Sequence, residues 1–389
     1  MSSQLMELRI NEILNFIRME NEMTRIKLSK LTGLSKPSVS LIVNGLIKEG
    51  IVKEIGLGNS RPQGGRRPIR LSFVPDYALV LSVDVGGCKS IFSIIDLAGN
   101  VLHKKTVISP TAPSQKEFLE FLFDNISEMI ALVDSSLLLA ISVGVAGTVD
   151  KKTQIIRKMP AFGLENVDIS EPLRKRFQVD VLVQNDVTLA AMGESWIGNA
   201  RNLSDVLLIS IGTGVGAGLV INGEVYTGFT GSAGEIGEMT TDWHIERQTA
   251  SFFGKLEEWF SGYSLQKFCQ RENIAANVPQ LFEMIDKSLE VKERIEEGCV
   301  HLALAIANAV SLLDPARVLI GGGIGYNQYD KIYPVVDRTL REVLHDSMYR
   351  SDLIVRASLE PLGVVIGGCY YAQKRILINK LCQSPHFGS

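Results

Sequence analysis

The chain has 389 residues, 46% hydrophobic and 21% charged, and it exceeds the length at which a single hydrophobic core usually stops growing. We therefore expect a largely folded chain of two or three domains. Five scattered cysteines form no C-x-x-C pair, which excludes a disulfide framework and a cysteine-rich zinc site. The sequence starts without a signal-peptide pattern, and the longest apolar stretches fall short of the ~18 to 20 residues that cross a bilayer, so a soluble cytoplasmic protein with no membrane partner is expected.

The net charge of −3 is unevenly distributed along the chain. Residues 1–70 contain 12 Lys and Arg against 6 Asp and Glu, a net charge of +6. The remaining residues contain 28 basic and 37 acidic side chains, a net charge of −9. A basic head joined to an acidic body predicts two partners of different chemistry.

The first 50 residues predict three short helices. Thr24 and Ser35 are natural N-cap residues for the second and third helices, and Gly33 allows a tight turn between them. The first helix has an apolar face at the spacing i, i+3, i+4 and i+7, made by Ile10, Ile13, Leu14 and Ile17. The third helix offers short polar groups and one cation to base edges and phosphates of the major groove: Lys36, Ser38, Ser40 and Asn44.

Two strands, residues 51–55 and 69–73, are predicted to form a hairpin around a loop rich in glycine, proline and arginine. Arg61, Arg66 and Arg67 make this loop a cationic wing that can approach phosphates or enter a minor groove. A single arginine is more often an ordinary solvated residue, but a helix-turn-helix followed by an arginine-rich wing favours DNA binding. Residues 1–75 are therefore predicted to be a winged helix-turn-helix domain.

From residue 77 onward, apolar strands alternate with glycine turns. Three of these turns, Asp84–Gly87, Gly212–Gly218 and Gly321–Gly323, follow directly on predicted strands. Such turns let backbone N–H groups approach a phosphate, and Asp84 could face Mg²⁺ or water beside it. Such glycines can also serve only a twisted hairpin, and one turn of this kind would be uninformative, but three at strand ends are not.

Asp186 follows a short buried strand at residues 181–183 and precedes a helix that is expected to begin near Leu189. In a cleft between two lobes, its carboxylate can accept the proton of a sugar hydroxyl that attacks a phosphoryl group. It can equally well only hydrogen-bond that hydroxyl.

Together these motifs resemble the ROK family, named for repressors, open reading frames and sugar kinases, within the actin-like ATPase superfamily. Asp84–Lys89 resembles the family motif D-x-G-G-T-K, Gln184–Asp186 resembles E-N-D, and Ala233–Gly237 resembles A-G-E-I-G-H. With the winged helix in front, the whole chain resembles the sugar-responsive repressors of the family. The implied fold is α/β: a winged helix-turn-helix followed by a two-lobed actin-like (ribonuclease H-like) domain. Its lobes are expected at 76–195 and 196–367, with 368–389 completing the first lobe.

The resemblance also implies roles for individual residues. Asp186 would be the base in members that are kinases. The nucleotide contacts would be Asp84, Gly86, Gly87, Lys89, Gly212, Thr213, Gly214, Gly321, Gly322 and Gly323. The sugar contacts would be Asn185, Asp186, Glu235, Glu238 and Glu257.

The chain departs from the family at its structural zinc site, which is built from three cysteines and one histidine. Gln248, Ala250 and Lys255 stand at the cysteine positions and Glu238 at the histidine position, so we expect no structural zinc. Glu238 adds an acceptor-only carboxylate to the sugar pocket. A pocket lined by several carboxylates suits a neutral monosaccharide or small oligosaccharide and repels a sugar phosphate.

Two functions remain open at this point. The first is a repressor, a homodimer or dimer of dimers, that releases operator DNA when sugar closes the cleft. The second is an ATP-dependent sugar kinase of the glucokinase or N-acetylglucosamine kinase type, which needs ATP and Mg²⁺. The winged helix favours the repressor. Cys88 in place of threonine and Gln184 in place of glutamate bear on catalysis rather than on binding.

Overall fold

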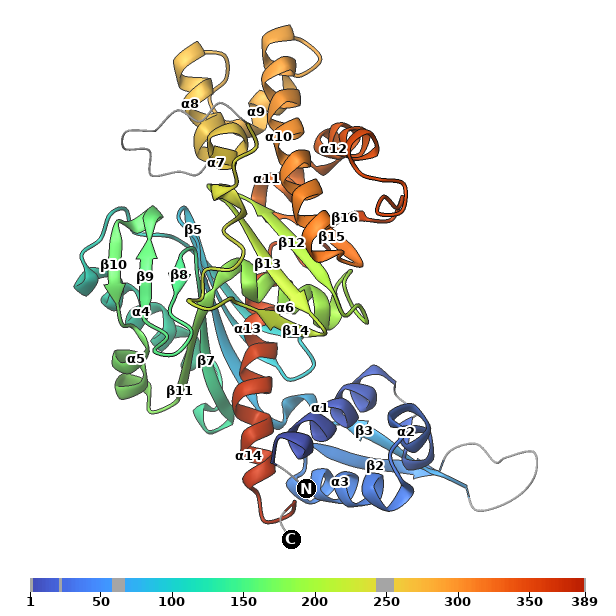
Figure 1. Cartoon of the computed structure of the whole chain (residues 1–389). Helices are drawn as coiled ribbons and strands as arrows, with labels where there is room; N and C mark the ends of the chain where they lie inside the picture. Colours follow the sequence, from blue (N-terminus) through green and yellow to red (C-terminus); the bar gives the residue numbers. More distant parts are fainter. Residues whose placement is uncertain (1–2, 21–22, 58–66, 243–254, 388–389) are drawn as a thin grey trace.

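The computed structural model describes residues 3–20, 23–57, 67–242 and 255–387. They form an N-terminal head and a larger body with two lobes, each built on a five-stranded sheet (Figure 1).

The head is a winged helix-turn-helix, as the sequence predicts. Thr24 accepts a hydrogen bond from the Lys27 N–H (3.3 Å) and so begins the second helix. Ser35 does the same for the third helix through the Ser38 N–H (3.2 Å), and Gly33 turns the chain between them at a φ of 68°. The predicted apolar face of the first helix is buried. The elements are α1 (Ser3–Met19), β1 (Met23–Thr24), α2 (Arg25–Thr32), α3 (Lys36–Glu49), β2 (Val52–Leu57) and β3 (Ile69–Phe73).

The first lobe contains a mixed sheet in the order β11-β7-β4-β5-β6. β4, β5 and β6 form an antiparallel meander, while β7 runs parallel to β4, and β11 runs parallel to β7. A small sheet of three short strands, β8 to β10, was not predicted. The elements are β4 (Leu79–Val85), β5 (Lys89–Asp96), β6 (Val101–Ile108), α4 (Gln115–Ile130), β7 (Leu138–Val145), β8 (Thr148–Val149), β9 (Ile156–Met159), β10 (Leu164–Val167), α5 (Ser170–Phe177) and β11 (Asp180–Asn185).

The second lobe repeats this plan with the order β14-β13-β12-β15-β16. β12, β13 and β14 form the meander, and β15 and β16 add to it in parallel. Duplicated lobes of this kind confirm the predicted actin-like architecture. The elements are β12 (Val206–Ile211), β13 (Val215–Ile221), β14 (Glu224–Tyr226), α7 (Lys255–Phe260), α8 (Gly262–Glu272), α9 (Val278–Glu283), α10 (Leu289–Leu313), β15 (Arg317–Gly321), α11 (Gly322–Asn327), α12 (Tyr329–Val343) and β16 (Ile354–Arg356).

Within the described residues, helix α10 is long and apolar enough to cross a membrane on length and composition alone. In the fold it packs against α7 and α12, and Leu302 and Ile306 are fully buried. A mostly buried helix of this kind is typical of a protein core.

Two helices lie between the sheets: α6 (Asp186–Ile197) and α13 (Gly363–Ala372) (Figure 1). α6 contacts β12 and β13 of the second sheet, and α13 contacts β4 and β7 of the first. Their backbones touch where they cross, because a Cβ on Gly367 would lie 1.7 Å from the Leu189 carbonyl oxygen. A Cβ on Gly193 would likewise lie 2.6 Å from the Gly363 oxygen. The expected lobe boundary at 367/368 therefore falls inside α13.

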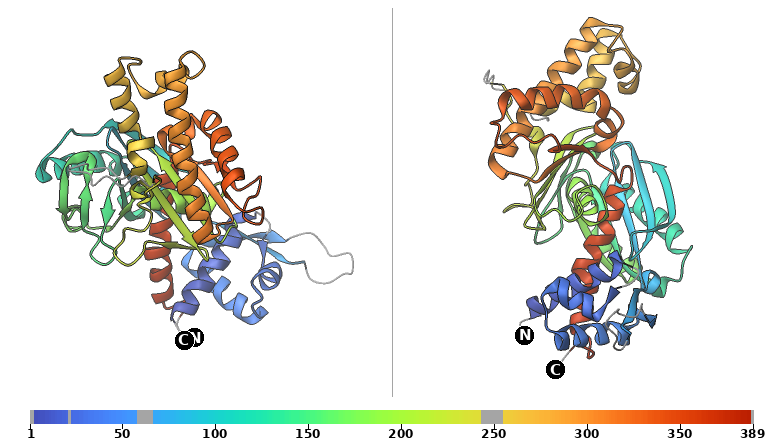
Figure 2. Two further views of the ribbon diagram at one scale, coloured as in Figure 1. Left: turned by 45° about the horizontal axis from the view of Figure 1, so that its top comes forward. Right: turned by 90° about the vertical axis from the view of Figure 1, so that its right-hand side faces the viewer.

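The chain continues from α13 through a π-helical turn, Gln373–Leu377, into α14 (Ile378–Gln383). α14 contacts α1, and the N- and C-terminal ends of the chain lie together in each view of Figures 1 and 2. Phe387 packs directly on Gly45 of α3, whose added Cβ would lie 2.7 Å from the phenyl ring. The C-terminal segment thus packs against helix α3.

Gly367→Ala should destabilise the protein, because the new methyl group forces α6 and α13 apart. We expect a cost of about 3 kcal/mol or more and a melting temperature lowered by about 4 °C or more. Gly363→Ala is the matched control, since its Cβ meets no atom closer than 3.6 Å. Equal melting temperatures for the two variants in differential scanning calorimetry would contradict the backbone contact.

Candidate functional site

The predicted site residues gather where the carboxyl ends of the parallel strands of both sheets face each other. Asp84 lies in β4, and Asn185 and Asp186 follow β11 at the start of α6. Ligands of open α/β sheets bind at this edge.

The helix after β11 begins at Asp186, three residues earlier than predicted. Asn185 is its N-cap: Oδ1 accepts a hydrogen bond from the Thr188 N–H (2.9 Å), and Nδ2 donates to the Gly147 carbonyl (3.1 Å). Asp186 Oδ1 accepts hydrogen bonds from the Val187 N–H (2.8 Å) and from Asn185 Nδ2 (3.1 Å). The N-cap of α6 therefore fixes the position of the predicted base.

Asp84 and Asp186 are close enough to influence each other's ionisation. Burial, together with the charges of Glu235 and Glu360, raises the pKa of Asp186 to about 7, against the lowering effect of backbone hydrogen bonds. Burial also raises the pKa of Asp84 well above its usual range, as do the charges of Asp186 and Glu360. Lys89 opposes the rise at Asp84. Perturbed carboxylates of this kind are typical of functional sites.

The second lobe contributes the other predicted sugar contacts. Partial removal from water raises the pKa of Glu235, and the charges of Glu257 and Glu238 raise it further. Glu257 accepts a hydrogen bond from the Val215 N–H through Oε1 (2.7 Å). Asp186 is therefore near Glu235, which in turn is near Glu257 and Glu238. The structure brings these four predicted carboxylates together.

Sequence reasoning missed one cation that lies beside the predicted sugar contacts. Lys158, in β9 of the small sheet, lowers the pKa of Glu235 by its positive charge. The sequence held no signal for it, because the short strands β8 to β10 were not predicted and their chain reversal carries Lys158 back to the cleft.

The three glycine turns differ in how they are held. Gly86 approaches the Lys89 carbonyl, where an added Cβ would be 2.8 Å from the oxygen. The Gly212 and Thr213 carbonyls accept hydrogen bonds from the start of α8, at Gly262 (2.8 Å) and Tyr263 (3.0 Å). The turn at Gly321–Gly323 is bound by Glu360, a residue that no motif had indicated.

The recognition helix presents part of the predicted DNA-binding set. Lys36 and Asn44 are exposed, while Ser38 Oγ is hydrogen-bonded to Ser35 Oγ (2.8 Å). Asn44 Oδ1 accepts from Arg25 (2.8 Å), which also pairs with a carboxylate of the wing strand β2. Ser40 is half-buried.

The wing and the zinc positions are only partly described. Arg67 is exposed, while Arg61 and Arg66 lie outside the described residues. The same holds for Gln248 and Ala250, so the expectation of no structural zinc stays a prediction. Glu238 and Lys255, the other two positions, are described.

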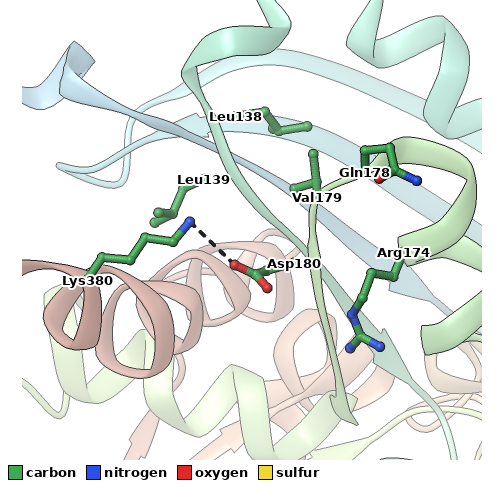
Figure 3. A pocket seen from close by; sticks show the side chains of 7 residues that line it. All are labelled: Leu138, Leu139, Arg174, Gln178, Val179, Asp180 and Lys380. Carbon is green, nitrogen blue, oxygen red and sulfur yellow. Dashed lines mark ion pairs between the residues drawn. The ribbon is translucent and has the colours of Figure 1, made fainter. Parts of the chain in front are cut away.

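A surface cavity of about 310 Å³ lies apart from these residues, at the opposite end of β7 and β11 (Figure 3). Asp180 at its floor forms an ion pair with Lys380 of α14 (3.4 Å), and Arg174 pairs with Glu171 (2.9 Å). Because its cations are already paired, we assign this cavity to the attachment of α14.

Two duplicated lobes with a shared cluster of carboxylates and glycine turns, behind a winged helix, define a DNA-binding protein with an actin-like body. The sequence model of the ROK family matches residues 80–375, and the chain belongs to this family.

Known relatives agree with both parts of this architecture. The xylose repressor of Bacillus subtilis is 28% identical over 341 residues, which cover 87% of this chain and 86% of the relative. The crystal structure of a ROK family transcriptional regulator, described as a homologue of the Escherichia coli MLC protein, covers 97% of this chain and 98% of its own, with 23% identity and a TM-score of 0.81. A ROK hexokinase from Thermus thermophilus covers 75% of this chain and 96% of its own, with 24% identity and a TM-score of 0.63.

The raised pKa of Asp186 predicts a pH-dependent stability. Its pKa in the folded protein is about 7, above the ~3.9 of an unfolded aspartate. The folded state therefore keeps the Asp186 proton up to a higher pH than the unfolded state does. The stabilisation that comes from this proton is lost as pH rises from about 4 through 7. The free energy of unfolding of Asp186→Asn should therefore rise relative to that of the unmodified protein by about 2 to 3 kcal/mol when the pH is raised from 5 to 8.

Denaturant titrations at these two pH values measure this difference. The exposed Glu165→Gln is the control and should show no pH-dependent difference. An Asp186→Asn effect that is the same at both pH values would contradict the burial of an ionisable carboxyl.

Proposed function

We propose that this chain is a sugar-responsive transcriptional repressor that binds operator DNA through its winged helix and a neutral sugar in the cleft between its lobes. The relative named a xylose repressor supports the regulatory class, and its match extends into the head. The four neighbouring carboxylates, Asp186, Glu235, Glu238 and Glu257, support a ligand rich in hydroxyl donors.

A single observation carries the proposal: helix α6 reaches from the sugar residues to the DNA-binding head. Its first turn holds Asp186, and near its end Trp196 stacks on Tyr370 of α13 with ring centroids 5.1 Å apart. Arg18 of α1 lies over this tryptophan, with its guanidinium carbon 5.9 Å from the ring centroid. Ten helical positions correspond to roughly 15 Å at 1.5 Å per residue.

Arg18 connects the head to the body at this point. Its guanidinium donates a hydrogen bond to Gln373 in the π-helical turn and lies 4.5 Å from the ring centroid of Phe73. Burial lowers its pKa to about 10, which reflects how fully the guanidinium is removed from water. A cation enclosed by groups of the head and the body makes the position of the head depend on the end of α6.

The regulatory mechanism follows from linkage. Sugar that draws the two lobes together displaces α6, and α6 displaces the head through Trp196 and Arg18. In a homodimer or dimer of dimers this changes the spacing of two winged helices, so sugar and operator favour different arrangements. A cytoplasmic location fits such a role.

The alternative is an ATP-dependent sugar kinase. Asp84, Asp186 and the glycine turns supply its parts, but the hexokinase match covers only 75% of the chain. A kinase has no use for the head. Glu238, in place of the family histidine, and Cys88, in place of threonine, also separate this body from the kinase pattern.

The function is tested with the full chain and DNA from its own upstream region, followed by fluorescence anisotropy at fixed salt. Xylose, glucose and mannose are added singly, with and without ATP, and ADP formation is measured in parallel. We expect one neutral sugar to release the DNA without ADP formation, and its 6-phosphate or 5-phosphate ester to be less effective. ADP formation by a protein without DNA affinity at any salt would establish the kinase instead.

Arg18→Met should weaken the coupling between the two ligands. Coupling of about 1 to 3 kcal/mol corresponds to a roughly 5- to 150-fold ratio of operator affinities without and with saturating sugar. We expect this ratio to fall towards one in Arg18→Met, while sugar affinity stays within about twofold because the substitution is remote from the cleft. Arg375→Met removes an exposed cation two positions from Gln373 and should keep the full ratio. An unchanged ratio in Arg18→Met would show that the head is coupled by another route.

A further inference from the structure

The loop between β16 and α13 places one carboxylate against a glycine turn. It is anchored by Glu194 of α6, which is 1% exposed. Glu194 accepts hydrogen bonds from the N–H groups of Ser358 (2.6 Å) and Leu359 (2.7 Å). The next residue, Glu360, is therefore held in place by the backbone before it.

Glu360 accepts the hydrogen bond of a backbone N–H group in the third glycine turn. The Gly322 N–H donates to Glu360 Oε1 at 2.6 Å, and Gly322 has a φ of 76°, in the left-handed region. A Cβ added to Gly321 would lie 3.2 Å from the same oxygen. This turn had been predicted to approach a nucleotide, and its backbone donor is satisfied by the chain's own carboxylate.

Glu360 also adds negative charge to the centre of the cleft. Its charge raises the pKa values of both Asp84 and Asp186, so the three carboxylates lie within electrostatic reach of one another. Lys89 opposes this charge at Asp84 and at Glu360. A polyanionic triphosphate brought to the same edge would meet three carboxylates and one lysine.

From this contact we infer that Glu360 occupies a backbone donor that a nucleotide would need at the third glycine turn and so prevents ATP from binding there. The inference rests on the proposed function and sharpens it: sugar alone is the effector, and the nucleotide half of the cleft is closed by an internal carboxylate. Glu360 is then the residue that determines specificity against nucleotides.

The test is isothermal titration calorimetry of the full chain with AMP-PNP and Mg²⁺, with neither sugar nor DNA present. The unmodified protein should give no binding heat. Glu360→Ala frees the Gly322 N–H and removes one charge, and should raise nucleotide affinity by at least about tenfold. Glu360→Gln keeps an oxygen acceptor for Gly322 but loses the charge, so its affinity should lie between the two.

Glu165→Ala, an exposed substitution in the same lobe as Asp84, is the control and should not bind nucleotide. The melting temperature of each variant shows whether it is folded. If Glu360→Ala is not folded, the AMP-PNP affinity of Glu360→Gln decides the test. Equal AMP-PNP affinity of the unmodified protein and Glu360→Ala would overturn the inference, as would two folded variants that still fail to bind. The operator assay without ATP tests the proposed function on its own. A failure of the proposed function would appear there as missing DNA affinity or a missing sugar response, whatever the calorimetry shows.

Discussion

Helices α6 and α13 cross with their backbones in contact, and the remaining functional parts of the chain are arranged around that crossing. Gly193 and Gly367 leave no side chain between the helices, so the two backbones are in direct contact. Close-packed interfaces of this kind shift between discrete arrangements rather than deform gradually. Because α6 packs on the second sheet and α13 on the first, the crossing also sets how the two lobes face each other. The relative orientation of the two lobes therefore depends on a helix contact that contains none of the predicted site residues.

The same crossing connects the cleft with the head. α6 begins with Asp186 and ends near Trp196, and α13 runs on into the turn that carries Gln373. Arg18 bridges these two helix ends from α1. Taking a guanidinium out of water is costly, and the cost is offset here only while the hydrogen bond to Gln373 and the aromatic contacts persist. The docked head is thus sensitive to small displacements of either helix.

The sequence predicted the parts of the fold that depend on local signals. The apolar spacing of α1, the N-caps Thr24 and Ser35, and the strand-turn pattern of both lobes all have short-range causes, and the structure confirms them. Glu360 and Lys158 could not be predicted, because each reaches the cleft through a long-range neighbour. Glu360 arrives there because β16 pairs in parallel with β15, and Lys158 because β9 belongs to a sheet of strands two to four residues long. The start of α6 was misplaced by three residues, because Asn185 was considered as a ligand contact and not as a helix cap.

Holding this many carboxylates close together is energetically unfavourable. This unfavourable energy favours an effector that donates hydrogen bonds, as a sugar does. Burial and mutual repulsion raise the pKa values of Asp84, Asp186, Glu235 and Glu360, so the free cleft holds carboxyl groups away from their preferred ionised state. Sugar hydroxyls that donate hydrogen bonds stabilise the ionised form without adding charge. Under the proposed function, these donors act best when residues of both lobes surround the ligand, so the sugar would have a higher affinity for a closed arrangement than for an open one. A ligand shifts a conformational equilibrium only through such a difference in affinity. A phosphate-bearing ligand would add to the repulsion, so the charge that we propose to act against a nucleotide would also favour a neutral sugar.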